Sequence, residues 1–179
     1  MSLEGKRVII LCAEDFQDME LMYPYYRLIE EGADVFVVGV KDGEYKGKYG
    51  YPVETNGSIE QYDPAECDAV IVPGGWAPDK LRRSKDVLNF IKAMDEEGKI
   101  VAAICHGPWV LVSAGVANGR RMTCFNAIKD DVVNAGAEYS DESVIIDENI
   151  VTSRTPDDLP DFCRAVIGLL QMKKVESVE

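Results

Sequence analysis

Continuous apolar runs, separated by segments of helical length, dominate the pattern of this chain. Residues 7–13, 68–72 and 99–104 are nearly uninterrupted hydrophobic stretches, which are typical of parallel strands buried on both faces. Residues 34–40 predict one more strand. Such strands have no polar face, so other elements must cover both sides of the sheet that they form.

The segments between these runs predict helices and two hairpins. Residues 19–31 carry apolar side chains at helical spacing, and Gly32 follows as a natural C-cap. Further helices are predicted at residues 86–98, 108–114, 130–134 and from 155 to about 173, and hairpins within residues 43–57 and 143–153. Strands that alternate with helices predict an α/β fold with an open, mostly parallel sheet covered on both sides.

Three segments follow directly after predicted strands. They are the acidic loop that begins at Glu14, the turn Pro73-Gly74-Gly75, and Cys105. Ligands of open α/β sheets bind outside the carboxyl ends of the strands. We therefore expect these three segments to converge on one crevice.

Cys105 is the candidate nucleophile of that crevice. An apolar strand leads into it, and Gly107 and Pro108 follow before a helical segment, which is the strand–turn–helix pattern of a nucleophile elbow. A cysteine at a strand end usually packs as a small hydrophobic residue, but this turn and the Gly-Gly turn together favour a reactive thiol. The backbone N–H groups of His106 and Gly75 are the natural oxyanion donors.

His106 is the only histidine of the chain. A serine hydrolase of the α/β-hydrolase type needs a histidine later in the sequence, and a class I glutamine amidotransferase needs a distant His-x-Glu pair. Both are absent, so His106 must be the histidine of any catalytic triad. Side chains of adjacent residues at a turn usually diverge, so the pattern leaves open whether the His106 ring reaches Cys105.

Composition sets the broad class of the protein. The 179 residues fit a single domain, residues 1–179, and no apolar run approaches the length of a membrane span. The N-terminus lacks the apolar core of a signal peptide, so we expect a cytoplasmic protein that does not bind membranes. The net charge of −13 disfavours binding to nucleic acid. The five cysteines form no C-x-x-C pair, which argues against disulfides and a zinc site, and we expect no metal or cofactor.

Four motifs in the right order resemble the PfpI-type intracellular proteases of the ThiJ/PfpI superfamily. They are Ala103-Ile-Cys-His-Gly-Pro108, Pro73-Gly74-Gly75, Glu20-Leu-Met-Tyr-Pro-Tyr25 and Arg154-Thr-Pro-Asp-Asp-Leu159. The resemblance implies a flavodoxin-like three-layer sandwich that assembles as a dimer or hexamer. It also implies a Cys-His site at the subunit interface, completed by an acidic residue of the neighbouring chain. Peptidase, glyoxalase and deglycase activities occur in the family, as do chaperone-like and stress roles.

The family's site positions depart from its pattern in this chain. The glutamate that contacts the nucleophilic sulfur falls on Gln17, whose amide cannot carry a proton between steps, which argues against aldehyde chemistry that needs a carboxyl there. Glu14, Asp15 or Asp18 could replace it only if the loop shifts, and we interpret them as a solvated, helix-capping run.

Three further positions follow from the resemblance. The interface acid of the family falls on Asp79, contributed by the neighbouring subunit and one methylene shorter than glutamate. The site tyrosine falls on Phe125, which lacks the hydroxyl donor. Trp76 stands where relatives often carry a polar or basic residue, and either narrows the pocket or packs at the oligomer interface.

Two functional hypotheses follow. In the first, Cys105 attacks the carbonyl carbon of a peptide, a small aldehyde or its adduct, the N–H groups of Gly75 and His106 hold the oxyanion, and His106 with Asp79 moves the protons. In the second, the protein is a noncatalytic stress-response protein and Cys105 is a redox-sensing thiol. The retained elbow and histidine favour the enzyme.

Overall fold

A computed structural model describes residues 2–176. Its centre is a six-stranded sheet in the order β2-β1-β5-β6-β10-β9, parallel throughout except for β9, which runs antiparallel to β10. The strands are β1 (Arg7–Cys12), β2 (Asp34–Gly39), β5 (Ala69–Val72), β6 (Ile100–Ile104), β9 (Val144–Asp147) and β10 (Ile150–Ser153). The predicted parallel sheet and the hairpin at its edge are confirmed.

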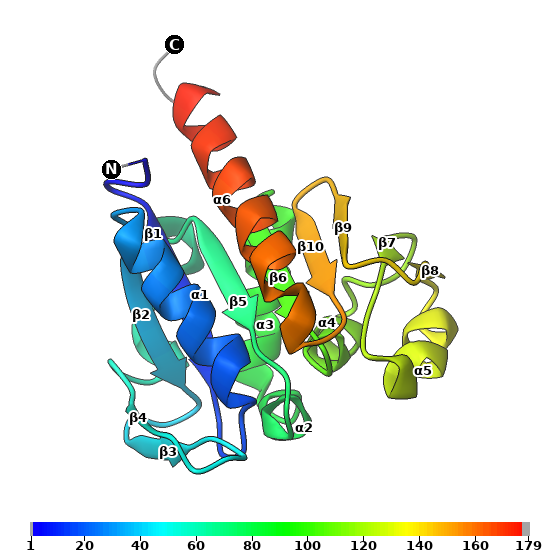
Figure 1. Ribbon diagram of the computed structural model, residues 1–179, viewed down its shortest axis with the longest axis horizontal. Helices are drawn as coiled ribbons and strands as arrows, with labels where there is room; N and C mark the ends of the chain where they lie inside the picture. The colour runs from blue at the N-terminus through cyan, green and yellow to red at the C-terminus, as the bar shows by residue number, and fades with distance from the viewer. Residues whose placement is uncertain (1, 177–179) are drawn as a thin grey trace.

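Helices cover both faces of this sheet. The helices α1 (Asp18–Glu30) and α6 (Leu159–Glu176) pack side by side on one face, and α3 (Lys85–Glu96) and α4 (Pro108–Ala114) lie together on the other (Figure 1). This is the expected three-layer sandwich. The central strands β5 and β6 are buried at every position, as continuous apolar sequence requires of strands covered on both sides.

Smaller elements flank the central sheet. The predicted hairpin consists of β3 (Glu44–Lys46) and β4 (Pro52–Glu54). The short helix α2 (Ala77–Leu81) follows the Gly-Gly turn, and α5 (Lys129–Asn134) lies beside the two-residue parallel strands β7 (Arg121–Met122) and β8 (Glu138–Tyr139). The sequence pattern did not predict α2, β7 or β8, because elements this short carry no periodic signal.

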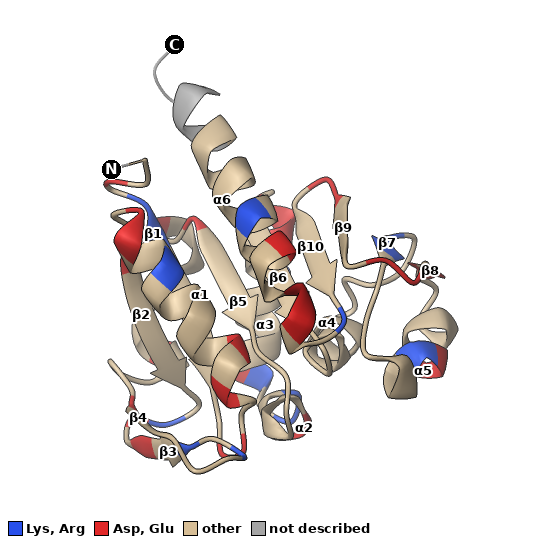
Figure 2. Ribbon diagram, in the orientation of Figure 1, with Lys and Arg blue, Asp and Glu red and all other residues tan. Residues whose placement is uncertain are grey.

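Charged residues lie mostly in the helices and loops, whereas the strands of the central sheet contain few of them (Figure 2). All five cysteines are buried and free, as expected of small hydrophobic residues. Within residues 2–176, no helix combines the length and the apolar character that crossing a bilayer requires.

Candidate active site

Cys105 lies at the turn between β6 and α4 with a φ of +61°, a left-handed conformation that a non-glycine residue adopts at a cost of about 1–3 kcal/mol. Hydrogen bonds on both sides hold it there: its N–H donates to the carbonyl of Ser153 at 3.0 Å, and its carbonyl accepts from Phe125 at 2.9 Å. A Cβ on Gly107 would lie 2.4 Å from the carbonyl oxygen of Val72. The predicted elbow is therefore present, and it is a strained one.

The Gly-Gly turn after β5 lies against this elbow. A Cβ on Gly74 would lie 2.7 Å from the Cβ of Cys105 and 2.5 Å from Oε2 of Glu20, so only glycine fits. Gly75 has a φ of +74° and directs its N–H at the sulfur of Cys105. The N–H of His106 also hydrogen-bonds the sulfur. The two N–H groups predicted as oxyanion donors thus meet at the sulfur of Cys105, the predicted nucleophile.

A buried carboxyl group, that of Glu20, completes the surroundings of the thiol. Glu20 lies in the first turn of α1 and has no exposed surface. Its Oε2 accepts the N–H of Gly74 at 2.6 Å, and its side chain hydrogen-bonds Cys105. Burial raises the pKa of Glu20 to about 7, against the opposing effects of these hydrogen bonds and of the Lys48 charge.

The expectation that Gln17 leaves the sulfur without a carboxyl neighbour is therefore wrong. Gln17 lines the same cavity, but its Oε1 accepts the N–H of Glu20 at 2.9 Å and caps α1. Positions 17 and 20 lie one helical turn apart, so counting along the motif placed the carboxyl one turn too early. The signal for Glu20 was a lone glutamate in the first turn of a helix, next to the apolar residues Leu21 and Met22.

The other acidic residues of this loop do not line the cavity, but the interpretation of them as a helix-capping run is wrong, because Gln17 caps α1. Asp15 forms an ion pair with Lys80 at 2.8 Å, and Glu14 accepts the N–H of Lys46 at 3.2 Å. Asp18 accepts two N–H groups of the loop between β3 and β4. Their contacts are thus with neighbouring loops and helices.

The ring of His106 does reach the thiol: its Nδ1 lies 3.3 Å from the sulfur of Cys105. Three aromatic residues surround the imidazole. Phe125 stacks on it with a centroid distance of 5.0 Å, Trp109 meets it edge-on at 5.1 Å, and Trp76 lies at 5.9 Å. Burial, and then the charge of Lys48, lower the pKa of His106, so the ring is neutral at pH 7 and can accept a proton.

The thiol of Cys105 is a poor acid in this environment. Burial, followed by the Glu20 carboxylate, raises its pKa to about 12, against the two N–H groups that stabilise the thiolate. A resting thiol of this kind needs a base during the reaction, and His106 and Glu20 both lie beside it.

These groups face a cavity of about 180 Å³ at the carboxyl ends of the strands. Its lining residues come from the loops after β1, β3, β5 and β6, among others: Gln17, Glu20, Lys48, Tyr49, Gly75, Trp76, Cys105, His106, Phe125 and Pro156. The predicted convergence of separate segments on one crevice is confirmed.

Asp79 does not line this cavity within its own chain. It lies in α2, and its carboxylate pairs with Arg83 one turn along. Its expected role therefore rests on a neighbouring subunit.

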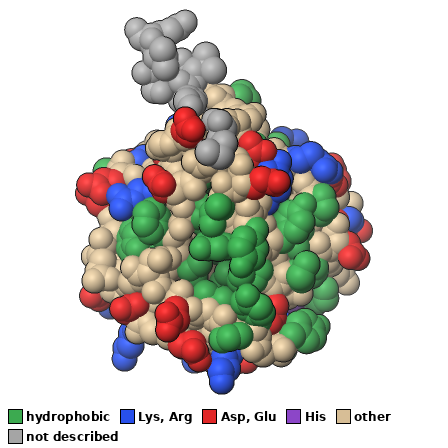
Figure 3. Space-filling view, turned by 60° about the vertical axis from the view of Figure 1, so that its left-hand side comes forward, with side chains coloured by type: hydrophobic (Ala, Val, Ile, Leu, Met, Phe, Trp, Pro, Cys, Tyr) green, Lys and Arg blue, Asp and Glu red, His purple; other side chains and the backbone are tan. Residues whose placement is uncertain are grey.

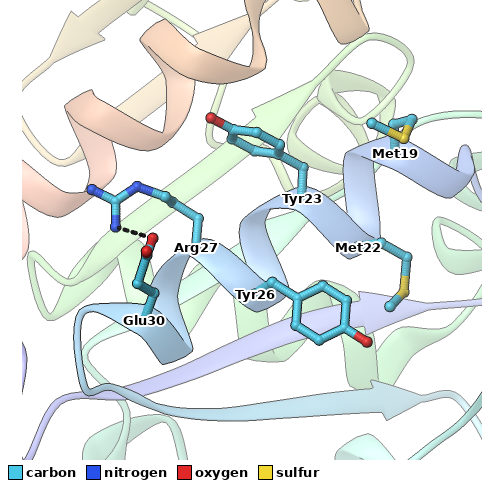
Figure 4. Close-up of a pocket in the computed structure, with 6 residues that line it drawn as sticks. All are labelled: Met19, Met22, Tyr23, Tyr26, Arg27 and Glu30. Atoms are coloured by element: carbon cyan, nitrogen blue, oxygen red, sulfur yellow. Dashed lines mark hydrogen bonds and ion pairs between the residues drawn. The ribbon is translucent and has the colours of Figure 1, made fainter.

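A larger cavity, about 670 Å³ and wide open, lies on the outer face of α1. Met19, Met22, Tyr23 and Tyr26 line it together with the ion-paired residues Arg27 and Glu30 (Figure 4). The residues that line it include no cysteine, serine or histidine. Met19, Tyr26 and Ile29 of α1 are exposed, and hydrophobic side chains gather on one face of the molecule within a ring of charged ones (Figure 3).

Comparisons with known proteins agree with this geometry. The model of the DJ-1/PfpI family matches residues 6–169. A protein of Pyrococcus abyssi named a deglycase is 47% identical over 92% of this chain and 99% of its own length. A putative cysteine protease of Bacillus subtilis is 40% identical over 93% of this chain and 99% of its own. Among solved structures, Drosophila melanogaster DJ-1beta superposes with a TM-score of 0.88 at 28% identity, covering 97% of this chain and 95% of that one.

Proposed function

Because this chain belongs to the DJ-1/PfpI family, we propose that it is a cysteine-dependent hydrolase that removes carbonyl adducts from amines and thiols. One observation carries this proposal. The thiol of Cys105, on a strained turn, lies beside the buried carboxyl of Glu20, the ring of His106 and two N–H donors. Nucleophile, acid/base and oxyanion donors are the three components that attack on a carbonyl carbon requires.

Activation of the thiol falls to His106. Its neutral ring accepts the thiol proton at Nδ1, 3.3 Å away, and the thiolate adds to the carbonyl carbon. The C–S bond forms as the carbonyl electrons move to oxygen, where the N–H groups of Gly75 and His106 stabilise the charge.

Glu20 supplies the proton transfer that the reaction of an aldehyde requires next. In the cavity, an adduct of methylglyoxal first reverses: its carbinol O–H proton passes to the departing amine or thiol as the C–N or C–S bond breaks, and the Cys105 thiolate adds to the aldehyde carbon that is freed. Glu20 then takes the proton from this carbon, now bound to the Cys105 sulfur, and returns one to the neighbouring carbon, which converts the hemithioacetal into a lactoyl thioester. Water then cleaves the thioester to lactate and free thiol. Each adduct consumes one water and needs no external oxidant or reductant. A pKa of about 7 allows Glu20 to act in both directions near neutral pH.

Self-association is part of the proposal. Asp79 of a neighbouring subunit would orient His106 through the ring nitrogen that does not face Cys105. Two features support assembly as a dimer or hexamer: the partial exposure of His106, and the exposed apolar face of α1, because apolar patches of that kind commonly mark contact surfaces.

The test compares the wild type with Cys105→Ala on methylglyoxal adducts of amino acids and on peptides, following lactate and new amino groups. Lactate release by the wild type alone supports deglycation. Peptide cleavage alone assigns the site to proteolysis, as in the putative protease among the relatives. Equal, near-zero turnover by both proteins overturns the enzymatic reading and leaves the redox-sensing hypothesis.

A further inference from the structure

The active-site cavity contains two side chains that can carry full charge besides its histidine and cysteine: Glu20 and Lys48. Burial favours the neutral form of both Glu20 and His106. The positive charge of Lys48 is felt at both groups, since it lowers the pKa of each. Lys48 is therefore the cation that faces whatever binds at Cys105, in a chain whose net charge is −13.

The loop that carries Lys48 is held firmly over the site. The carboxylate of Asp18 accepts the N–H groups of Tyr49 at 3.0 Å and Tyr51 at 3.1 Å, and the N–H of Lys48 donates to the carbonyl of Phe16 at 2.9 Å. Gly47 lies so close that a Cβ there would be 2.4 Å from Asp18. The hairpin loop is thereby attached to the first turn of α1, the turn that also carries Glu20.

Among the residues that the structure describes, the ammonium group of Lys48 forms no ion pair with a carboxylate. None of the ion pairs found within residues 2–172 includes Lys48, whereas Lys6, Lys80, Lys92 and Lys99 are paired. Its ammonium lies 5.2 Å from the centre of the exposed ring of Tyr49, a contact that leaves the charge available. The lysine is thus exposed, unpaired in this part of the chain and part of the cavity lining.

We propose that Lys48 is a specificity-determining residue that binds a carboxylate of the substrate, so that the enzyme prefers carbonyl adducts of compounds with a free carboxylate, such as free amino acids. This inference rests on the proposed function, since it names the substrate class of the same site. The aromatic side chains of Trp76 and Phe125 line the cavity as well and offer an apolar surface to the remainder of the adduct. Asp18 is a positioning residue that holds the loop.

A matched pair of substrates tests the carboxylate directly. Methylglyoxal adducts of N-acetylcysteine and of N-acetylcysteinamide differ only in that group. We expect the wild type to favour the acid by about tenfold in kcat/KM, the effect of one hydrogen bond to a charged group. Lys48→Met should reduce this preference at least fivefold, mainly through KM, by the same argument. Lys46→Met is the control, because Lys46 lies in the same hairpin, is exposed and does not line the cavity.

A binding measurement separates this inference from the proposed function. Lactate is titrated into Cys105→Ala protein, and the single imidazole signal of His106 is followed by NMR. Binding that Lys48→Met weakens and Lys46→Met does not supports the anion site even if no adduct is turned over. Equal turnover of both adducts, unchanged in Lys48→Met, overturns the role of Lys48 while leaving the enzymatic function intact. Asp18→Asn should weaken lactate binding in the same way as Lys48→Met.

Discussion

The side-chain oxygen of Gln17 accepts the backbone N–H of Glu20 at 2.9 Å, so an amide at the start of α1 fixes the turn that directs a buried carboxyl toward Cys105. The two residues have different roles. Gln17 caps the helix and lines the cavity, and Glu20 supplies the proton-carrying group. Retention of that carboxyl is what makes aldehyde chemistry available to this site.

Replacing Glu20 with glutamine should abolish most deglycation while retaining the fold. The amide has the same shape but cannot carry a proton, and loss of a general acid/base costs about 10²- to 10⁴-fold in kcat. The same change removes the carboxylate that raises the pKa of Cys105, so iodoacetamide should alkylate the thiol faster at pH 8 than in the wild type. Glu14→Gln, which alters an acid that contacts the β3 backbone, serves as the control for both measurements.

Stability should fall as pH rises through the pKa of Glu20. Its pKa is raised from 4.5 to about 7 in the folded protein, so between these values the folded state holds a proton that the unfolded state has released. The stabilising contribution is complete below pH 4.5 and is lost by pH 7, a change of about 3 kcal/mol. Urea unfolding of wild type and Glu20→Gln across this range measures the difference. Parallel curves for the two proteins would contradict the raised pKa.

The sheet could be predicted because strands buried on both faces are apolar at every position, and the elbow because a specific turn sequence follows one of these strands. Residues 69–72 and 100–104 are apolar at every position, and the Gly-Pro pair after His106 marks the turn. The contact between Glu20 and Cys105 joins residues 85 positions apart in the sequence, and a local sequence pattern cannot indicate which distant residues come into contact. The direction of the His106 ring depended likewise on packing against Trp109 and Phe125.

Because the chain has one histidine, the NMR titration of His106 reports on the aromatic side chains around its ring. Burial is the main cause of the lowered pKa of His106, and Phe125 stacks on the ring at 5.0 Å. Phe125→Ala should expose the ring and move its pKa upward toward 6.5, as followed by NMR. Phe125→Tyr keeps the stacked ring and should leave the titration close to that of the wild type. An unchanged pKa in the alanine variant would mean that Phe125 does not shield His106 from water.

Gly74 should tolerate no side chain. A Cβ there would lie 2.5 Å from Oε2 of Glu20 and 2.7 Å from the Cβ of Cys105, so Gly74→Ala must displace both reactive groups. Overpacking of this kind costs about 1–3 kcal/mol in unfolding free energy, and we expect turnover to fall more steeply than stability does. Gly168→Ala in α6 is the control, since a Cβ there meets nothing within 4 Å. A fully active Gly74→Ala protein would show that the site is looser than these distances require.

A site shared between subunits should be restored by mixing two inactive proteins. Cys105→Ala removes the nucleophile, and Asp79→Ala removes the acid that we expect a neighbour to supply. Asp79 pairs with Arg83 on the surface of its own helix, so its loss should cost less than about 1 kcal/mol in stability.

If both variants are unfolded together and refolded, a mixed dimer holds one site in which Cys105 and the partner's Asp79 are both intact. Random pairing then restores about a quarter of wild-type activity. Native mass spectrometry verifies that mixed oligomers form. Mixed oligomers without recovered activity, or an Asp79→Ala protein as active as the wild type, would show that Asp79 is not part of the site.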